Sequence, residues 1–261
     1  MHDPQALATY LRQRAPLGSV VSYPDRGPWG DNRYPGNCSG YLLIDLCATY
    51  HPRRVLDPME GGGTSREVCA DMDIPYAGFD LRSGTDSLRD DVGSGYDLIF
   101  WHPPYHDMKV YNDDLRDMSR AGSLVAFLSL LRNGYRRFFD LLAPGGRLAI
   151  LMGDLRRRGR YEPLTADVAR LDRNHLESIV VKVQHNVASN KVQYGGAFIP
   201  ILHETLTIFR RTTNDERRTM NDERRTTNDE RRTMNDERRT MNDERRTMND
   251  ERRTTNWARQ P

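Results

Sequence analysis

The order of apolar and polar residues along the first 209 positions predicts strands and helices in turn. Short apolar runs predict strands at residues 54–57, 76–80, 96–101, 147–152, 177–184 and 204–209. Apolar residues at helical spacing predict a helix at 39–50, capped by Ser39, and another at 123–142 that ends at a Pro-Gly-Gly turn. Strands that alternate with helices indicate an α/β protein with a mostly parallel sheet covered on both faces. The last two strands lack an intervening helix, which indicates an antiparallel hairpin.

Both ends of the chain depart from this pattern. Residues 1–35 are rich in Pro, Gly and Tyr and predict an extended, turn-rich lead-in. From Arg210 to Glu251 the chain consists of six copies of RRT(T/M)NDE, followed by a partial copy. One Met at most per copy cannot form a coiled-coil seam. We therefore predict a domain at 1–209 and a low-complexity tail at 210–261 that is disordered or a single helix.

Composition limits the classes of protein that fit. The whole chain is 37% hydrophobic, but without the repeat the remainder is about 44% apolar, which is ordinary for a globular domain. It has no apolar run of about 18 residues and no apolar signal core, so we expect a cytoplasmic protein without a membrane segment. Three cysteines without CxxC spacing argue against a disulfide framework and a zinc site, and we expect no metal. The net charge of +2 gives no reason by itself to expect a nucleic-acid partner.

A glycine-rich turn follows the first predicted strand. Asp57-Pro58 ends the strand and Gly61-Gly62-Gly63-Thr64 opens a helix, whose first N–H groups are available to a ligand. Asp80 ends the next strand about 23 residues later, where a carboxylate could accept hydrogen bonds from ribose hydroxyls. The spacing is not GxGxxG, and Asp57 would repel a pyrophosphate, so an amino-bearing or cationic ligand fits better than NAD. A tight turn with purely structural glycines is the alternative.

The strand at 96–101 ends in a second unusual turn, His102-Pro103-Pro104-Tyr105. Two prolines cannot continue a central strand, and they hold the exposed backbone in an extended turn. The turn presents a carbonyl, an imidazole and an aromatic ring at the carboxyl end of the sheet. Open α/β folds bind their ligands at that end.

Together the two turns resemble motifs of the S-adenosylmethionine-dependent amino-methyltransferases of DNA. DPMEGGGT looks like motif I, and HPPY looks like motif IV, whose usual form is (D/N/S)PP(Y/F/W). WGDNRYPGNCSGYLLIDL is similar to motif X, and APGGRLAILMGD and FIPILHETLTIF look like later strand motifs. The resemblance covers roughly residues 29–209. It implies a Rossmann-like methyltransferase fold with a mostly parallel, seven-stranded sheet and a C-terminal antiparallel hairpin.

For the cofactor, the resemblance implies a set of binding residues. The methionine part of S-adenosylmethionine would be held by Asp57, Pro58, Gly61, Gly63 and Thr64, the ribose by Asp80, and the adenine ring would meet Asp86.

For the target base, the resemblance implies that the HPPY turn is catalytic. Tyr105 would stack on the base, and the Pro103 carbonyl and His102 would accept hydrogen bonds from its exocyclic amine, with Pro104 completing the turn. These hydrogen bonds would orient the nitrogen lone pair toward the methyl sulfonium, so catalysis is chiefly positioning. The base would be flipped, because its amine cannot meet the cofactor inside a duplex.

His102 departs from the Asp, Asn or Ser that is usual in motif IV. A neutral imidazole has one acceptor nitrogen and could replace the usual side chain, whereas an imidazolium could not. Because of this histidine, the domain could be inactive or could have a different target. In the related turns, Asp or Asn usually accompanies adenine N6, and Ser accompanies cytosine N4.

Basic residues near these turns could contact a nucleic-acid backbone. Arg156, Arg157, Arg158 and Arg160 follow the predicted strand at 147–152, and Lys109 follows HPPY. Arginines there could neutralise phosphates, although a solvated loop is an equally good interpretation. No separate target-recognition domain is visible, so we expect a short site read by these loops, or help from a second subunit or a cognate restriction enzyme.

The sequence therefore predicts a DNA methyltransferase. It would transfer a methyl group from S-adenosylmethionine to the exocyclic amine of a base flipped out of double-stranded DNA, with adenine N6 favoured and cytosine N4 second. Methylation of RNA or of a protein glutamine is an alternative, because an Asn-type PPY turn also serves those substrates. The other alternative is a non-catalytic, cofactor-binding protein that binds nucleic acid, which the unusual His102 would suit.

Overall fold

The computed structural model describes residues 4–157, 159–185 and 197–212. Its helices are α1 (Pro4–Gln13), α2 (Gly40–Tyr50), α3 (Thr64–Asp71), α4 (Leu124–Asp140) and α5 (Leu164–Ala169). Its strands are β1 (Val20–Ser22), β2 (Val55–Asp57), β3 (Tyr76–Gly78), β4 (Tyr96–Trp101), β5 (Leu142–Gly153), β6 (Leu155–Arg157), β7 (Arg160–Glu162), β8 (Leu176–Val183) and β9 (His203–Arg210). Short 3-10 turns occur at Leu81–Ser83 and Met118–Arg120.

Seven of these strands form one sheet, in the order β1-β8-β9-β5-β4-β2-β3. β2 pairs in parallel with β3 and β4, β4 pairs in parallel with β5, and β1 pairs in parallel with β8. β9 runs antiparallel to both of its neighbours, β5 and β8. The predicted fold class, a Rossmann-like, mostly parallel sheet of seven strands with a C-terminal antiparallel hairpin, is therefore confirmed.

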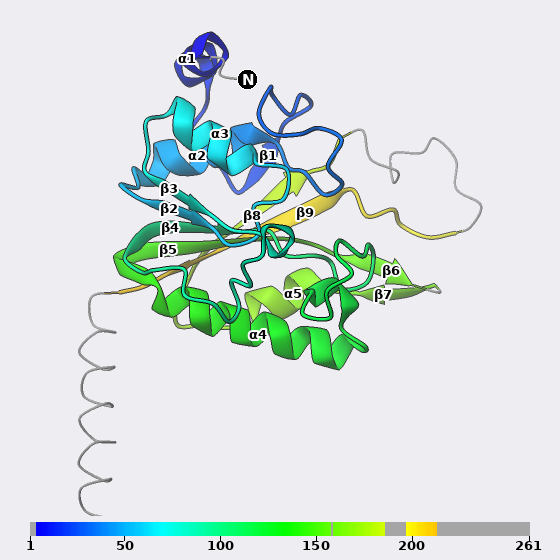
Figure 1. Cartoon of the computed structure of the whole chain (residues 1–261). Helices are drawn as coiled ribbons and strands as arrows, with labels where there is room; N and C mark the ends of the chain where they lie inside the picture. The colour runs from blue at the N-terminus through cyan, green and yellow to red at the C-terminus, as the bar shows by residue number, and fades with distance from the viewer. Residues whose placement is uncertain (1–3, 158, 186–196, 213–261) are drawn as a thin grey trace, which may run out of the picture. The chain divides into compact units, whose positions relative to one another are not determined.

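Helices cover both faces of the sheet (Figure 1): α2 and α3 lie on one face, and α4 and α5 lie on the other. Side chains alternate along β4, so Leu98 and Phe100 belong to the core cluster under α2, whereas Ile99 and Trp101 belong to the cluster under α4. Both sets are buried, which explains why β4 is a continuous apolar run rather than an alternating one.

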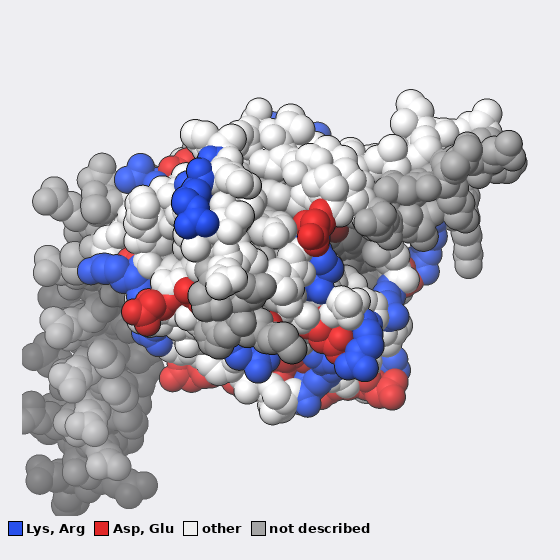
Figure 2. Space-filling model, turned by 90° about the horizontal axis from the view of Figure 1, so that it is seen from above, with Lys and Arg blue, Asp and Glu red and all other residues white. Residues whose placement is uncertain are grey.

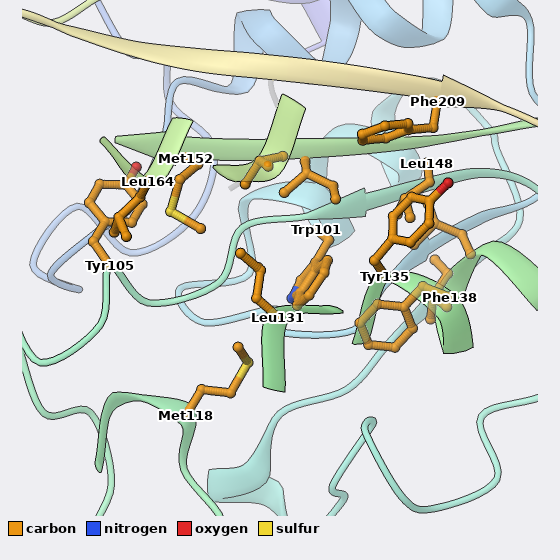
Figure 3. Close-up of a cluster of buried hydrophobic side chains, with 14 of the residues drawn as sticks. Trp101, Tyr105, Met118, Leu131, Tyr135, Phe138, Leu148, Met152, Leu164 and Phe209 are labelled. Carbon is orange, nitrogen blue, oxygen red and sulfur yellow. The ribbon is translucent and has the colours of Figure 1, made fainter. Parts of the chain in front are cut away.

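The core cluster under α4 is rich in aromatic side chains, as Figure 3 shows. The Trp101 ring meets the edge of Phe138 at a centroid distance of 4.9 Å, and Tyr135 meets Phe209 of β9 at 4.8 Å. Edge-to-face pairs of this kind add to the stabilisation that burial alone provides. Tyr105 of the HPPY turn also belongs to this cluster, so the turn is anchored in the core.

The prediction of an extended lead-in over residues 1–35 is wrong at α1, and it did not identify β1 as part of the sheet. Pro4–Gln13 form α1, in which a proline at the first helical position loses no hydrogen bond. Tyr10 of α1 donates a 2.8 Å hydrogen bond to Asp45 on α2, so a tertiary contact stabilises a helix too short to stand alone. Val20–Ser22 form β1, the edge strand that brings the sheet to seven.

The predicted helix at 123–142 is confirmed, with one correction at its end. Ser123 caps α4, since its side chain accepts a 3.1 Å hydrogen bond from the Ala126 N–H. The helix ends at Asp140 and not at the Pro-Gly-Gly turn, because Leu142 already pairs with Tyr96 in the sheet. The Pro-Gly-Gly turn therefore lies within β5.

β9 continues through Arg210, the first residue of the predicted tail. Beyond Thr212 the tail lies outside the described residues, so its disorder or single helix stays a prediction. Within the described ranges no helix is long and apolar enough to cross a membrane.

The aromatic packing under α4 predicts a large cost for truncating Phe138, which is fully buried. Phe138→Ala should lower the free energy of unfolding by about 3–5 kcal/mol, through lost burial and the cavity left behind. Val125, on the same helix but 79% exposed, provides the matched control, and Val125→Ala should change the free energy by less than about 0.5 kcal/mol. Urea unfolding followed by circular dichroism measures both. Equal effects of the two substitutions would contradict the described packing.

Candidate active site

The carboxyl ends of β2, β3, β4 and β5 surround a cavity of about 1180 Å³. The predicted site residues that line it are Asp57, Pro58, Gly61, Thr64, Asp80, Asp86, His102, Pro103, Pro104, Tyr105, Lys109, Arg156 and Arg157. Gly63 and Arg160 are described but do not line the cavity, and Arg158 lies outside the described residues. The two turns found in the sequence therefore share one cavity.

Asp57 is a buried carboxylate at the end of β2. Its oxygens accept a 2.5 Å hydrogen bond from the Ser65 hydroxyl and a 3.1 Å hydrogen bond from the Met59 N–H. Burial raises the pKa of Asp57 to about 7, and nearby Glu60 and Asp80 add to the rise, while the two hydrogen bonds oppose it. Within the described residues no cation pairs with Asp57, so this acid suits a cationic ligand.

The glycine turn after Asp57 is shaped by its backbone. Gly63 adopts φ 80° as the residue before α3, a left-handed conformation that favours glycine. The Gly61 N–H donates a 3.0 Å hydrogen bond to Asp80, which lies just after β3. The turn is thereby tied to the second acid predicted for the ligand.

The segment before α2 packs directly on this turn. The Asp31 N–H donates a 2.9 Å hydrogen bond to the Gly62 carbonyl, and the Thr64 hydroxyl donates to the side-chain oxygen of Asn37. Trp29, fully buried, donates a 2.7 Å hydrogen bond from its indole to Asp71 on α3. The stretch that resembles motif X thus contacts the stretch that resembles motif I.

The two acids predicted for the ribose and adenine have protein partners in the structure. Asp80 accepts hydrogen bonds from the Arg82 N–H at 2.8 Å and from its guanidinium at 3.0 Å. The same guanidinium lies 4.4 Å from the centre of the Tyr34 ring, at the mouth of the glycine turn. Asp86 accepts from the Leu88 N–H at 3.1 Å and from Arg89. A ligand at either acid has to share or displace these donors.

The HPPY turn is held by a line of polar contacts that ends on the C-terminal hairpin. His102 Nε2 lies 2.9 Å from the Tyr105 hydroxyl, which donates a 2.6 Å hydrogen bond to Glu204 Oε1. Lys182 Nζ donates a 2.7 Å hydrogen bond to the other oxygen, Glu204 Oε2. Lys182 on β8 and Glu204 on β9 are direct partners in the antiparallel pairing.

The charges in this line have different physical origins. Burial lowers the pKa of His102, with Lys182 acting in the same direction and Glu204 opposing it. Burial alone would raise the pKa of Glu204, but Lys182, His102 and the Tyr105 hydroxyl together lower it to about 2. Burial, followed by the charge of Glu204, raises the pKa of Tyr105 well above its usual value. At neutral pH the line therefore consists of a neutral imidazole, a neutral phenol and one ion pair.

Gly153, at the end of β5, leaves the space that the Tyr105 ring occupies. A Cβ at Gly153 would lie 2.6 Å from Tyr105 Cε2, closer than packed atoms tolerate. With the glycine, the ring is only 8% exposed and still lines the cavity. Only glycine fits at this position without moving the ring.

Arg156, Arg157 and Arg160, the described arginines of the predicted loop, lie on two paired strands instead. β6 and β7 pair with each other through Leu155–Glu162 and Arg157–Arg160. Arg157 forms an ion pair with Asp107 just after the HPPY turn, and Arg160 lies 3.4 Å from Glu162. The loop interpretation is wrong because residues on both sides of position 158 pair as strands, a pattern too short to be evident in the sequence.

Arg156 has aromatic rather than acidic neighbours. Its guanidinium lies 5.4 Å from the centre of the Tyr161 ring and 5.2 Å from that of Phe198. On the face that Figure 2 presents, Lys and Arg side chains lie among acidic and uncharged ones and do not gather in one basic patch. Of the predicted phosphate contacts that are described, Arg156 and Lys109 are those without an ion pair to an acid.

Sequence reasoning missed Lys182, Glu204 and Gly153. A charged residue inside each of two apolar strand patterns was the available signal for Lys182 and Glu204. Their meeting depends on the register of β8 and β9 and on the position of Tyr105, which the sequence pattern does not contain. In the described part of the chain, no group of three or more His, Cys, Asp or Glu side chains could hold a metal ion.

Comparisons with known proteins give matches only among solved structures. No family model matches the chain, and no curated protein matches it. A candidate DNA modification methylase of Thermus thermophilus, complexed with S-adenosyl-L-methionine, is 24% identical and has a TM-score of 0.35, with 61% of this chain and 56% of that chain covered.

Two further matches among solved structures carry other names. TrmN of Thermus thermophilus is 21% identical over 66% of this chain and 48% of its own, with a TM-score of 0.40. The N-methyltransferase NodS of Bradyrhizobium japonicum, in complex with S-adenosyl-l-homocysteine, is 16% identical over 66% of this chain and 85% of its own, with a TM-score of 0.37. The chain spans about half the length of the two Thermus proteins. A function for this chain therefore has to rest on its own residues.

The close approach at Gly153 predicts a specific effect of adding one methyl group. Gly153→Ala should push the Tyr105 ring away and weaken its contacts with His102 and Glu204, at a cost of about 1–3 kcal/mol in the free energy of unfolding. Gly122 has open space around its hypothetical Cβ, so Gly122→Ala is the control and should leave stability nearly unchanged. Chemical denaturation of both variants is the measurement. A Gly153→Ala protein as stable as the parent would mean that the ring is not confined there.

Proposed function

We propose that the chain is an S-adenosylmethionine-dependent methyltransferase that methylates the exocyclic amine of a flipped base in double-stranded DNA, with adenine N6 as the target. The observation that carries the proposal is the shared cavity. It joins a buried acid and a glycine turn on one side to the HPPY turn on the other. The first side suits an amino-bearing cofactor, and the second side suits an amine that has to be held by acceptors.

The residues present fit the cofactor. Asp57 is a buried carboxylate whose raised pKa reports the lack of a compensating cation, and the amino group of the methionine part would supply one. Gly61 and Thr64 line the cavity beside it. Asp80 would bind ribose hydroxyls once Arg82, whose side chain is 43% exposed, moves aside. When bound, the cofactor supplies a methyl group on a sulfonium.

The HPPY turn fits the amine of the base. An exocyclic amine has two N–H groups, and the turn offers two acceptors, the Pro103 carbonyl and the His102 ring nitrogen that does not face Tyr105. Hydrogen bonds to both would direct the nitrogen lone pair away from the turn and toward the glycine-turn side of the cavity. The lowered pKa keeps His102 neutral near neutral pH, so it can accept a hydrogen bond and then the proton that the methylated amine releases.

The mouth of the cavity offers contacts for a polymer. Lys109 and Arg156 line it, and the Arg156 guanidinium lies over the rings of Tyr161 and Phe198. A guanidinium next to aromatic rings can contact a phosphate or stack on an unpaired base. A flipped base would have to pass these groups, and recognition of a short site by these loops, or by a second subunit or partner, is part of the proposal.

Transfer of labelled methyl groups tests the function directly. The full chain should transfer radiolabel from S-adenosylmethionine to double-stranded DNA, and nucleoside analysis should find it on adenine N6. His102→Ala should reduce the rate by about 100-fold or more, while Val125→Ala, at an exposed position that does not line the cavity, should keep the parent rate. Label on cytosine N4, on RNA or on protein glutamine would show that this group, and not adenine N6, is the target. Binding of the cofactor without transfer to any polymer would replace catalysis with a binding role.

The raised pKa of Asp57 predicts that cofactor affinity depends on pH. A cationic amino group needs the ionised carboxylate, so affinity should be full above the Asp57 pKa of about 7 and fall as pH drops through it. S-adenosylhomocysteine should bind about tenfold more weakly at pH 6 than at pH 7.5. Calorimetry measures both values. Asp57→Asn should bind weakly with little pH dependence, and a parent protein with equal affinity at both pH values would remove Asp57 from the binding step.

A further inference from the structure

The hydrogen bonds that run from His102 to Lys182 fix the direction of every proton between them. Glu204 pairs with Lys182 and has a lowered pKa, so it is a carboxylate and can only accept. The single hydroxyl proton of Tyr105 is therefore donated to Glu204, at 2.6 Å. The Tyr105 oxygen is left as an acceptor toward His102. His102 Nε2, 2.9 Å away, consequently has to carry a proton.

This proton assignment determines the other ring nitrogen of His102. A neutral imidazole carries one proton, and the pKa of His102 is lowered by burial, so the ring is neutral at neutral pH. With the proton on Nε2, the Nδ1 atom is an acceptor with a free lone pair. An acceptor is what the aspartate, asparagine or serine of the related turns would provide. The histidine provides one only in this tautomer and only while it is neutral.

We propose that Lys182 and Glu204 are positioning residues that hold His102 as the neutral, Nε2-protonated tautomer through Tyr105, so that Nδ1 accepts a hydrogen bond from the exocyclic amine. This inference rests on the proposed methyltransferase function. It assigns a role to two residues outside both sequence motifs. It also explains how a histidine can stand where an obligate acceptor is expected.

The pair has opposite effects that balance at His102. Glu204 is needed as the acceptor that orients Tyr105, but its negative charge favours the imidazolium. Lys182 offsets that charge from the neighbouring strand and opposes the imidazolium. An uncharged side chain in place of Glu204, such as an amide, could donate a hydrogen bond to Tyr105. The hydrogen bonds from Tyr105 to His102 would then run in the opposite direction. A lone carboxylate would charge the histidine.

Two other titratable groups near this line, Cys38 and Tyr111, are neutral in the relevant pH range. Burial raises the pKa of Cys38 to about 12. Burial also raises the pKa of Tyr111, with Asp117 and Glu204 adding to it. Lys182 and Glu204 are thus the charges that act on His102.

The burial of the ion pair supports a role beyond stability. Lys182 is 8% exposed and Glu204 is 7% exposed. Buried ion pairs cost desolvation free energy and can often be replaced by apolar residues without loss of stability. The charges of this pair act on His102, so its role is tested by the ionisation of His102 and not by stability.

The test compares the pH dependence of methyl transfer in the parent, Lys182→Met and Lys182→Arg proteins. At saturating S-adenosylmethionine, where cofactor binding through Asp57 no longer limits the rate, activity of the parent should fall on the acid side as His102 becomes protonated. In Lys182→Met, the unbalanced Glu204 should shift this acid limb upward by about one pH unit, whereas Lys182→Arg, which keeps the charge, should retain the parent profile. A folded Lys182→Met protein with an unshifted limb overturns the proposal.

Nuclear magnetic resonance of the imidazole nitrogens separates this inference from the proposed function, because it needs no turnover. The free parent protein should show His102, assigned with His102→Gln, as the Nε2-protonated tautomer with a slowly exchanging Nε2 proton. Its pKa should rise in Lys182→Met and stay in Lys182→Arg. If these results hold while no substrate is methylated, only the function fails. If methylation occurs but the His102 pKa is the same in all three proteins, only the positioning role fails.

Tyr105→Phe provides a second route should Lys182→Met not fold. It removes only the hydroxyl that connects His102 to Glu204, and the ring keeps its packing against Gly153. The slowly exchanging Nε2 proton signal should disappear, and kcat should fall by about tenfold or more while KM for the polymer changes little. Retention of both the signal and the parent kcat would contradict the proposed role of Tyr105 in connecting His102 to Glu204.

Discussion

The antiparallel insertion of β9 between β5 and β8 is the constraint on which the candidate site depends. Because β9 runs against its neighbours, its first residues lie beside the carboxyl end of β5, where the cavity opens. Glu204 is thereby opposite Gly153 on one side and Lys182 on the other. A parallel β9 would place its carboxyl end there instead, and the HPPY turn would have no acid to hold Tyr105.

Two titratable groups line the cavity, and burial disfavours the charged form of each. Desolvation raises the pKa of Asp57 and lowers that of His102, so both groups are driven toward their neutral forms. They differ in what opposes this. Asp57 has only hydrogen-bond donors, which leaves it ready for a cation, whereas His102 lies next to a compensated ion pair that leaves it neutral. One cavity can thus favour a positively charged ligand at one end and a neutral amine at the other.

Local patterns predicted most of the sheet, and the exceptions have identifiable causes. The six strands expected from apolar runs are all present, and β2, β4, β5 and β9 among them are largely buried. β1, β6 and β7 are short and largely exposed, whereas the equally short β2 is fully buried, and their pairing partners are remote or follow a turn. α1 was missed because contacts such as that of Tyr10 with Asp45, distant in sequence, stabilise it. Arg156 and Arg157 line the cavity, and the ion pair of Arg157 with Asp107 depends on the fold.

By itself, the sequence determined that two turns with unusual chemistry follow parallel strands, because glycine and proline restrict the backbone locally and strand order is visible in the apolar pattern. Parallel strands present their carboxyl ends at one edge, so the meeting of Asp57, Asp80 and His102 at one cavity followed from that pattern. The tertiary structure alone decided what surrounds each group. Register placed Lys182 opposite Glu204, and close approach at Gly153 placed Tyr105 between Glu204 and His102. Charge state and tautomer are properties of that environment, since they depend on burial and on neighbours that are far apart along the chain.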